Sequence, residues 1–320
     1  DSASGRALVI DGGLRAVVAV DLQTGARNVL SKGSTPDAVN PFSAPGFIAL
    51  DSGNGRALVV DADLEAVLAV DLLTGARSVL SDASTPDALN LFSAPGSIVL
   101  DSANGRALVV DFSPTAVMAV DLLTGARTVL SDASTPDAVN AFIAPASIAL
   151  DSANSRALVV DVNLSAVLGV DLLTGARTVL SDGSTPDAVN PFIAPGSITL
   201  DSANGRALVI DIFQRAVVAV DLLTGARTIL SDNSTPDAVN PFNAPTSIVL
   251  DSANGRALVV EPGIFPFFGL NAILAVDLQT GARTILSDVS MPDAVNPFIS
   301  AGSITLDSTN GRALVIDNGL

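Results

Sequence analysis

The sequence predicts an all-β fold, namely a β-propeller of four-stranded antiparallel blades, and three observations carry this prediction. Near-identical units of fifty residues begin at Asp51, Asp101, Asp151, Asp201 and Asp251. Each unit holds four short runs rich in Val, Ile and Leu that are bounded by turn residues, as β-strands are. The runs lack the 3.6-residue period of an amphipathic helix. Four strands per unit in about six units is typical of a propeller, and a parallel β-solenoid is the alternative.

We expect one domain over residues 1–320, because neither a linker nor a change in composition interrupts the repeats. The repeats span 1–50, 51–100, 101–150, 151–200, 201–250 and 251–306, and a partial repeat spans 307–320. Pairing of Ser303–Leu306 with the strands of residues 6–30 would close a ring of six blades. Arg312–Ile316 is then a surplus strand, which lies outside the ring, exchanges with another chain, or belongs to a ring of seven or more blades if the chain is truncated.

The strands and turns of one unit follow from its residues. We label the four strands A to D, and in the third unit the apolar runs are Ala107–Val110 (B), Ala116–Val120 (C), Thr128–Leu130 (D) and Ser147–Leu150 (A of the next blade). Their apolar residues are continuous rather than alternating, which is expected for strands covered on both faces. Asn104-Gly105 is a signal for a type I′ hairpin, and Gly125 is placed where a positive φ closes a longer hairpin.

The order of motifs in each unit resembles known propeller repeats. A Pro-x-x-Ile-x-x-Asp strand precedes a Leu-Val-x-Asp strand and a Val-Asp-x-x-Thr-Gly hairpin along the whole chain. This order is similar to that of the NHL, YVTN and SMP-30/gluconolactonase-like propeller groups. The resemblance implies the architecture, but one fold hosts many functions, so it leaves the activity open.

Composition excludes much catalytic chemistry. The chain has no Cys, His, Tyr or Trp and a single lysine, Lys32. Disulfides, thiolate or imidazole metal sites and a histidine base are therefore excluded. The net charge of −17 argues against nucleic acid as a partner, and no apolar run approaches the length of a membrane-spanning helix. The chain begins without Met or a leader, so we expect a trimmed chain with a secreted or periplasmic location.

Antiparallel order predicts where the charges lie. Thirteen acids and thirteen arginines are assigned to the end with the A–B and C–D turns, and twenty acids with three bases to the end with the B–C loops and D–A links. The three bases are Arg15, Lys32 and Arg215. The B–C loops, unlike the turns, differ between repeats, and divergent loops on a rigid scaffold often bind partners. We therefore expect an acidic, loop-variable face.

Two groups of residues on that face are candidate sites. Carboxylates suit calcium, and the weak metal candidates are Asp61, Asp63 and Glu65 in one loop and the ring of Asp11, Asp111, Asp161, Asp211 and Glu261. The second group is a Phe-rich insertion in the sixth B–C loop that is a candidate interface with a partner or another copy and contains Ile264, Phe265, Phe267, Phe268 and Leu270. The repeated Phe residues, such as Phe92, are expected to wedge between blades.

The sequence favours a non-enzymatic extracytoplasmic propeller that acts as a protein-interaction or assembly module through the acidic variable face and the Phe-rich loop. No residue is assigned a catalytic or cofactor-binding role, and Ca²⁺ is the one cofactor considered. The alternative is a calcium-dependent hydrolase resembling SMP-30/gluconolactonases, although the nearly uniform Asp ring departs from that group's mixed ligand set. A homo-oligomer, or strand exchange through Arg312–Ile316, is compatible with both hypotheses.

Overall fold

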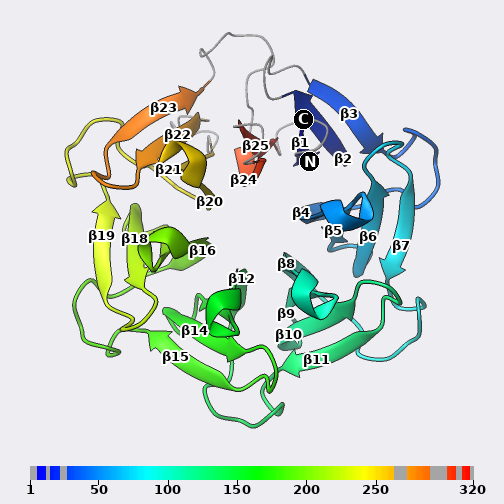
Figure 1. Cartoon of the computed structure of the whole chain (residues 1–320), viewed down its shortest axis with the longest axis horizontal. Helices are drawn as coiled ribbons and strands as arrows, with labels where there is room; N and C mark the ends of the chain where they lie inside the picture. Colours follow the sequence, from blue (N-terminus) through cyan, green and yellow to red (C-terminus); the bar gives the residue numbers. More distant parts are fainter. Residues whose placement is uncertain are drawn as a thin grey trace.

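Twenty strands form five four-stranded antiparallel blades around a central axis, with the A strand innermost and the D strand on the perimeter (Figure 1). The computed structural model describes residues 6–11, 15–21, 27–262, 272–288, 301–307 and 312–317. The blades comprise β4 (Pro45–Asp51), β5 (Arg56–Asp61), β6 (Ala66–Asp71) and β7 (Arg77–Ser81); β8 (Pro95–Asp101), β9 (Arg106–Phe112), β10 (Thr115–Asp121) and β11 (Arg127–Ser131); β12 (Pro145–Asp151), β13 (Arg156–Asp161), β14 (Ala166–Asp171) and β15 (Arg177–Ser181); β16 (Pro195–Asp201), β17 (Arg206–Asp211), β18 (Ala216–Asp221) and β19 (Arg227–Ser231); and β20 (Ser247–Asp251), β21 (Arg256–Glu261), β22 (Ala272–Asp277) and β23 (Arg283–Ser287).

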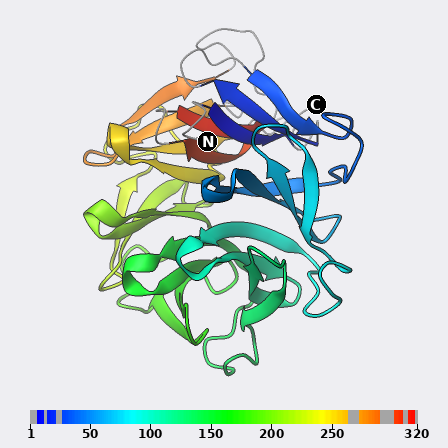
Figure 2. The same cartoon turned by 45° about the vertical axis from the view of Figure 1, so that its right-hand side comes forward.

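The prediction of six blades, or of seven or more, is wrong, because the described residues form five four-stranded blades. Two further sheets lie between the first and the last of these blades (Figures 1 and 2). One holds β1 (Arg6–Asp11), β2 (Ala16–Asp21) and β3 (Arg27–Lys32), and the other holds β24 (Ala301–Asp307) and β25 (Arg312–Asp317).

The pairing of β24 explains the error. Ile304 pairs with Val315 of β25, instead of joining the strands of residues 6–30. β1 and β25 carry the same sequence, RALVID, so both fit β24, but β25 is joined to it by a short connection. Closing a short loop costs less chain entropy than closing the whole ring. The strand predicted to be surplus therefore pairs within its own chain.

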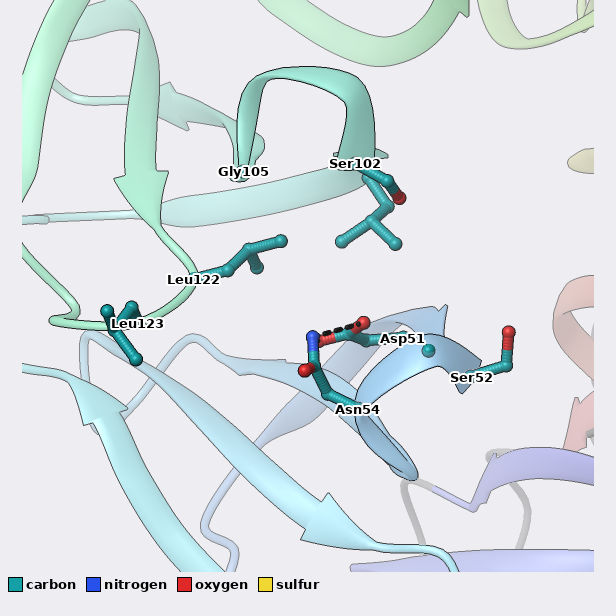
Figure 3. Close-up of a pocket in the computed structure, with 9 residues that line it drawn as sticks. Asp51, Ser52, Asn54, Ser102, Gly105, Leu122 and Leu123 are labelled. Carbon is teal, nitrogen blue, oxygen red and sulfur yellow. Dashed lines mark hydrogen bonds between the residues drawn. The ribbon is translucent and has the colours of Figure 1, made fainter.

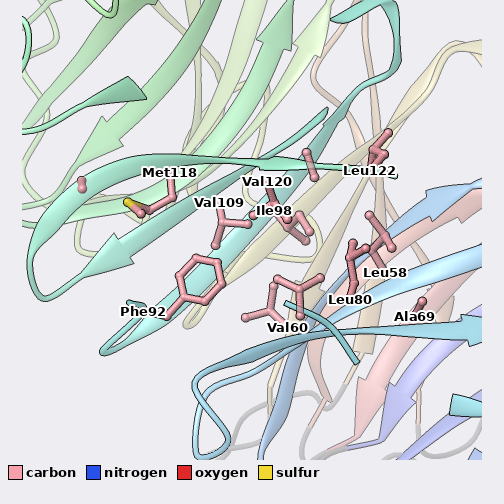
Figure 4. Close-up of a cluster of buried hydrophobic side chains, with 13 residues drawn as sticks. Leu58, Val60, Ala69, Leu80, Phe92, Ile98, Val109, Met118, Val120 and Leu122 are labelled. Atoms are coloured by element: carbon pink, nitrogen blue, oxygen red, sulfur yellow. The ribbon is translucent and has the colours of Figure 1, made fainter. Parts of the chain in front are cut away.

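The hydrophobic core lies between blades, and each middle strand contributes to two interfaces. In β5, Leu58 and Val60 pack with Val109 and Met118 of the next blade (Figure 4). Their neighbours in sequence, such as Val59, pack with residues of the preceding sheet. This arrangement explains why the apolar runs are continuous, as predicted for strands covered on both faces.

In the five complete blades the A–B turn is a short 3-10 helix followed by a left-handed residue, so the type I′ prediction for Asn104-Gly105 is wrong. The 3-10 segment Ser102–Asn104 (η3) ends at Gly105, whose φ is 64°. The Asp101 carboxylate accepts hydrogen bonds from Asn104 Nδ2 at 2.9 Å and Arg106 Nε at 2.8 Å. These side-chain bonds favour the wider turn. Equivalent segments are η2 (Ser52–Asn54), η4 (Ser152–Asn154), η5 (Ser202–Asn204) and η6 (Ser252–Asn254). Among the residues with assigned positions, no helix is long and apolar enough to span a bilayer.

The substitution Ser155→Gly is expected to stabilise the protein. Ser155 has φ 52° at the position where Gly105 and Gly205 stand in neighbouring repeats. A left-handed conformation costs a non-glycine residue about 1–2 kcal/mol, and glycine avoids this cost. Glycine also gives the unfolded chain more conformational freedom, which offsets part of the gain in stability. We expect a gain of about 0.5–1 kcal/mol in the free energy of unfolding, measured by urea denaturation. A lower stability of the variant would contradict this account of the turn.

Two arginines of a repeat, such as Arg106 and Arg127, hold neighbouring blades together. Arg106, at the start of a B strand, donates to the carbonyl of Leu172 in the next blade at 2.5 Å. Arg127, at the start of a D strand, reaches back to the preceding blade, where Nη1 donates to Ser81 Oγ and to the carbonyl of Asp82, both at 2.6 Å. The guanidinium of Arg127 also lies 5.7 Å from the ring centroid of Phe92. Phe92 is buried in the interface between these two blades, which confirms its predicted role as a wedge.

Candidate functional site

The variable face is formed by the B–C loops and the D–A links, and buried carboxylates fix these two segments to each other. Asp161 ends strand β13 and is fully buried. Its Oδ2 accepts a hydrogen bond from the Ile143 amide at 2.7 Å, and its Oδ1 accepts one from the Leu164 amide at 3.0 Å. Equivalent bonds to backbone amides of the D–A links are made by Asp61, Asp111, Asp211 and Glu261. Asp11 pairs with Ala16 at the corresponding position of β1, and its side chain lies outside the described residues.

The three calcium candidates of one loop, Asp61, Asp63 and Glu65, differ in burial and in hydrogen bonding. Asp61 Oδ1 accepts hydrogen bonds from the amides of Ala44 and Leu64, and Oδ2 accepts one from the Ser43 amide. Asp63 accepts a hydrogen bond from Ser43 Oγ at 3.1 Å, and Glu65 is exposed. In the part of the chain that the structure describes, no three acidic side chains form a group that could hold a metal ion. Calcium binding stays a prediction, which melting curves with calcium and with chelator test.

Glu261 differs from the aspartates at the equivalent positions. Its Oε2 accepts hydrogen bonds from the amides of Asn243 at 3.1 Å and Ala244 at 2.9 Å, whereas Oε1 is buried without a hydrogen-bond partner. Burial raises the pKa of Glu261 to about 7, although the two amides and the charge of Arg215 act in the opposite direction. A longer side chain at a position built for Asp therefore leaves one oxygen unsatisfied.

The substitution Glu261→Gln is expected to change how stability depends on pH. In the unfolded chain the carboxyl group has its ordinary pKa of 4.5, whereas folding raises the pKa to about 7. The folded state binds this proton more strongly than the unfolded chain does. The proton therefore adds to the free energy of unfolding below pH 4.5, and this stabilisation is lost as the pH rises through 7. Relative to the parent, the glutamine variant should gain on the order of 3 kcal/mol between these pH values, measured by denaturation. Glu65→Gln, at an exposed site, controls for the loss of one charge, and equal pH profiles for the parent and Glu261→Gln would contradict the expectation.

The D–A links carry well-ordered aspartates. Asp132 Oδ1 accepts hydrogen bonds from the amides of Ser134 and Thr135 and from Ser134 Oγ, at 2.6 to 2.9 Å. Burial favours the neutral carboxyl, but the hydrogen bonds from Ser134 and Thr135 outweigh it and lower the pKa of Asp132. The pKa is lowered in the same way at Asp82, Asp182 and Asp232. These carboxylates are therefore ionised at neutral pH.

The predicted separation of charge between the two ends needs a correction. Arg56 pairs with Asp51 at 2.8 Å, as predicted for the end with the A–B and C–D turns. The arginines that start the D strands leave that end: Arg127 is 3% exposed and donates to carbonyls of Thr85 and Asp87 in the preceding D–A link. The outer strands lie along the perimeter (Figure 1), so the start of β11 meets the link that follows β7. The turn end therefore lacks these neutralising arginines, and acids lie at both ends.

Exposed apolar side chains lie on the loops and links of the variable face. They include one residue of each described D–A link (Val39, Leu89, Val139, Val189 and Val239) and five further residues of the three middle blades. We call Leu91, Phe112, Ile143, Ile193 and Phe213 the apolar arc, and their exposed fractions range from 41% at Phe112 to 75% at Phe213. Hydrogen bonds join successive segments: Thr115 Oγ1 donates to the carbonyl of Phe142, Ser165 Oγ to that of Ile193, and Gln214 Nε2 to that of Pro191. The arc therefore continues over neighbouring loops and links.

Sequence reasoning identified the variable loops but not the apolar arc. The signal was present, because Ile143 and Ile193 stand where earlier repeats have Ser43 and Ser93. The predicted interface residues Ile264, Phe265, Phe267, Phe268 and Leu270 lie outside the described residues, so the site is built without them.

The opposite face holds a shallow cavity of about 390 Å³ between the first two complete blades (Figure 3). Asp51, Asn54, Ser102, Leu122 and Leu123 contribute to its lining. The carboxylate of Asp51 is already engaged by Asn54 and Arg56. These lining residues belong to turns that are nearly the same in every repeat, so the cavity follows from the fold.

Comparisons with known proteins support the fold. No family model matches the chain, and no curated protein matches it. Among solved structures, streptogramin B lyase has a TM-score of 0.67 at 15% identity, covering 98% of this chain and 87% of that chain. A chain of the nidogen/laminin complex has a TM-score of 0.64 at 13% identity, covering 87% of this chain and 91% of that chain. Virginiamycin B lyase from Staphylococcus aureus has a TM-score of 0.65 at 14% identity, covering 94% of this chain and 85% of that chain. The chain is a β-propeller, and its resemblance to the NHL and YVTN-like group is consistent with these neighbours.

Proposed function

We propose that this β-propeller is a non-enzymatic protein-interaction module that binds a partner through its variable face. The apolar arc carries the proposal. Five exposed apolar side chains lie on adjoining loops and links, at positions where the repeats differ, while the repeats otherwise keep nearly the same sequence. Contiguous exposed apolar surface with a polar rim is typical of interaction sites, and a rigid ring of blades presents it without reordering.

The neighbours favour binding over catalysis for this chain. The nidogen/laminin structure is a complex between proteins. A catalytically inactive form of virginiamycin B lyase replaces a histidine by alanine, and this chain contains no histidine. A lyase reaction that depends on that side chain would need a different group here. We therefore propose partner binding, with a secreted or periplasmic location that fractionation of the full-length chain would test.

Site-specific photo-crosslinking tests the proposed function. A photoreactive residue replaces Phe213 on the variable face or, as a control, Leu223 on the opposite face, which is 91% exposed. In extracts of the source organism, we expect a discrete protein adduct at position 213 and none at position 223. Equal labelling at both positions, or no adduct at position 213, would overturn the proposal, and light scattering shows whether the partner is a second copy.

A further inference from the structure

The arginines that start the D strands are buried beneath the D–A links and are not exposed on the variable face. Arg127, Arg177, Arg227 and Arg283 are at most 4% exposed, and their guanidinium groups are occupied by carbonyl and hydroxyl oxygens between blades. The arginines that start the B strands, such as Arg106, pair with buried aspartates such as Asp101 at 2.8 Å. Over the described ranges, Arg15, Lys32 and Arg215 are the remaining bases of the loops and links.

Aspartates of the D–A links stay accessible on the same face, unlike the buried carboxylates that end the B strands. The side chains of Asp137 and Asp187 are 57% and 54% exposed, and each lies no closer than 3.9 Å to the neighbouring buried arginine. Both belong to the D–A links that also carry Ile143 and Ile193 of the apolar arc. Asp132 and Asp182, at the start of these links, have pKa values lowered by their hydrogen bonds. The links that carry Ile143 and Ile193 of the apolar arc therefore also carry exposed negative charge.

In the first and the last of the described four-stranded blades, polar residues replace isoleucines of the apolar arc. The first complete blade has Ser43 at the position of Ile143, and the last has Asn243 there. Asp63 and Glu65 occupy the B–C loop of the first complete blade, at positions where the loop of Phe213 has no acid. A ligand that needs both apolar contact and negative charge therefore finds them together along β8 to β19.

From this combination we infer that the partner presents a cationic segment in which Lys or Arg residues alternate with large apolar side chains. The inference rests on the proposed function and adds the chemistry of the partner. The apolar arc supplies contact area for the apolar side chains, and the exposed aspartates of the same links attract the cations and set the orientation. A second copy of this chain fits poorly, because its net charge is also −17.

Three synthetic peptides of equal length test the chemistry. The first alternates Lys with Leu and Phe, the second replaces each Lys by Glu, and the third keeps Lys but replaces each apolar residue by Ser. In fluorescence anisotropy with the full chain, we expect the first peptide to bind at least about tenfold more tightly than either of the others. Equal affinity for the first and third peptides would mean unspecific attraction between opposite charges and would overturn the inference.

Matched variants locate the binding site of the first peptide. Phe213→Ser is expected to weaken its binding about tenfold or more, whereas Leu223→Ser on the opposite face should change it by less than about twofold. The double variant Asp137→Asn, Asp187→Asn should slow association several-fold at low ionic strength and less at high ionic strength. Equal effects of Phe213→Ser and Leu223→Ser would overturn the assignment of this face.

The two proposals fail differently. A crosslinked partner at position 213 whose attached segment is neutral or acidic would overturn the cationic inference and leave the interaction function standing. The absence of a position-specific adduct, combined with the failure of all three peptides to bind, would overturn both.

Discussion

Replacement of Gly125 by alanine is expected to destabilise the protein by about 3 kcal/mol or more. Gly125 lies in the C–D turn between β10 and β11 with φ 75°, and a Cβ placed there would lie 1.8 Å from the carbonyl oxygen of Leu80 in the preceding blade. Because the contacted atom belongs to the backbone of a neighbouring strand, the two blades would have to move apart. Gly175 and Gly225 meet Leu130 and Leu180 in the same way.

Gly105→Ala is the matched control. Gly105 has a similar φ of 64°, but no heavy atom lies within 4 Å of the point that an alanine Cβ would occupy. In this variant only the left-handed backbone conformation lowers the free energy of unfolding, by about 1–2 kcal/mol. Urea denaturation of both variants separates the two costs. Similar losses in stability would show that contact between blades at Gly125 contributes nothing.

The repeated sequence predicts the strands well, because duplication shows which residues each strand and turn requires. The B strand Arg106–Phe112 and the positive φ of Gly125 follow the predictions. The number of blades could not be obtained in this way. β1 and β25 have the same residues, so the pattern alone cannot decide which of them pairs with β24. Chain connectivity decides, through the cost of closing a loop.

The predicted distribution of charge was wrong for the outermost strands. The prediction assumed that every strand runs directly from the end with the A–B and C–D turns to the end with the B–C loops and D–A links. Arg127 was assigned to the turn end because it follows a C–D turn, yet it contacts Asp87 and Leu89 of the preceding link. The twist that neighbouring strands accumulate across a blade turns the outermost strand along the perimeter. Asp161 was likewise a candidate metal ligand on the acidic face, and only the fold places the Ile143 amide against it. Contacts between residues this far apart in sequence leave no local pattern.

Replacement of Arg127 by alanine is the second large effect that we expect, a loss of about 3–5 kcal/mol in the free energy of unfolding. The guanidinium donates to carbonyls of Asp82, Thr85, Asp87 and Asn90 in one link. Removal of the side chain would leave these oxygens without a donor and would expose the ring of Phe92 to a cavity. Burial lowers the pKa of Arg127, and the charges of Asp87 and Asp82 oppose this effect. The hydrogen bonds to the link carbonyls stabilise the buried guanidinium cation.

Two further variants show whether the loss of stability in Arg127→Ala comes from the hydrogen bonds of the guanidinium group or from the loss of a positive charge. Arg127→Lys keeps the charge but cannot reach the same set of oxygens, so we expect it to recover less than half of the loss. Arg215→Ala, at an exposed position of a B–C loop, should change stability by less than about 0.5 kcal/mol. Hydrogen exchange should report the damage at residues 82–92 first, because in a repeat architecture each unit depends mainly on its neighbours. Uniform exchange over all blades in Arg127→Ala would instead mean that the ring opens as one unit, and that this arginine does not act as a local tie between β7 and β11.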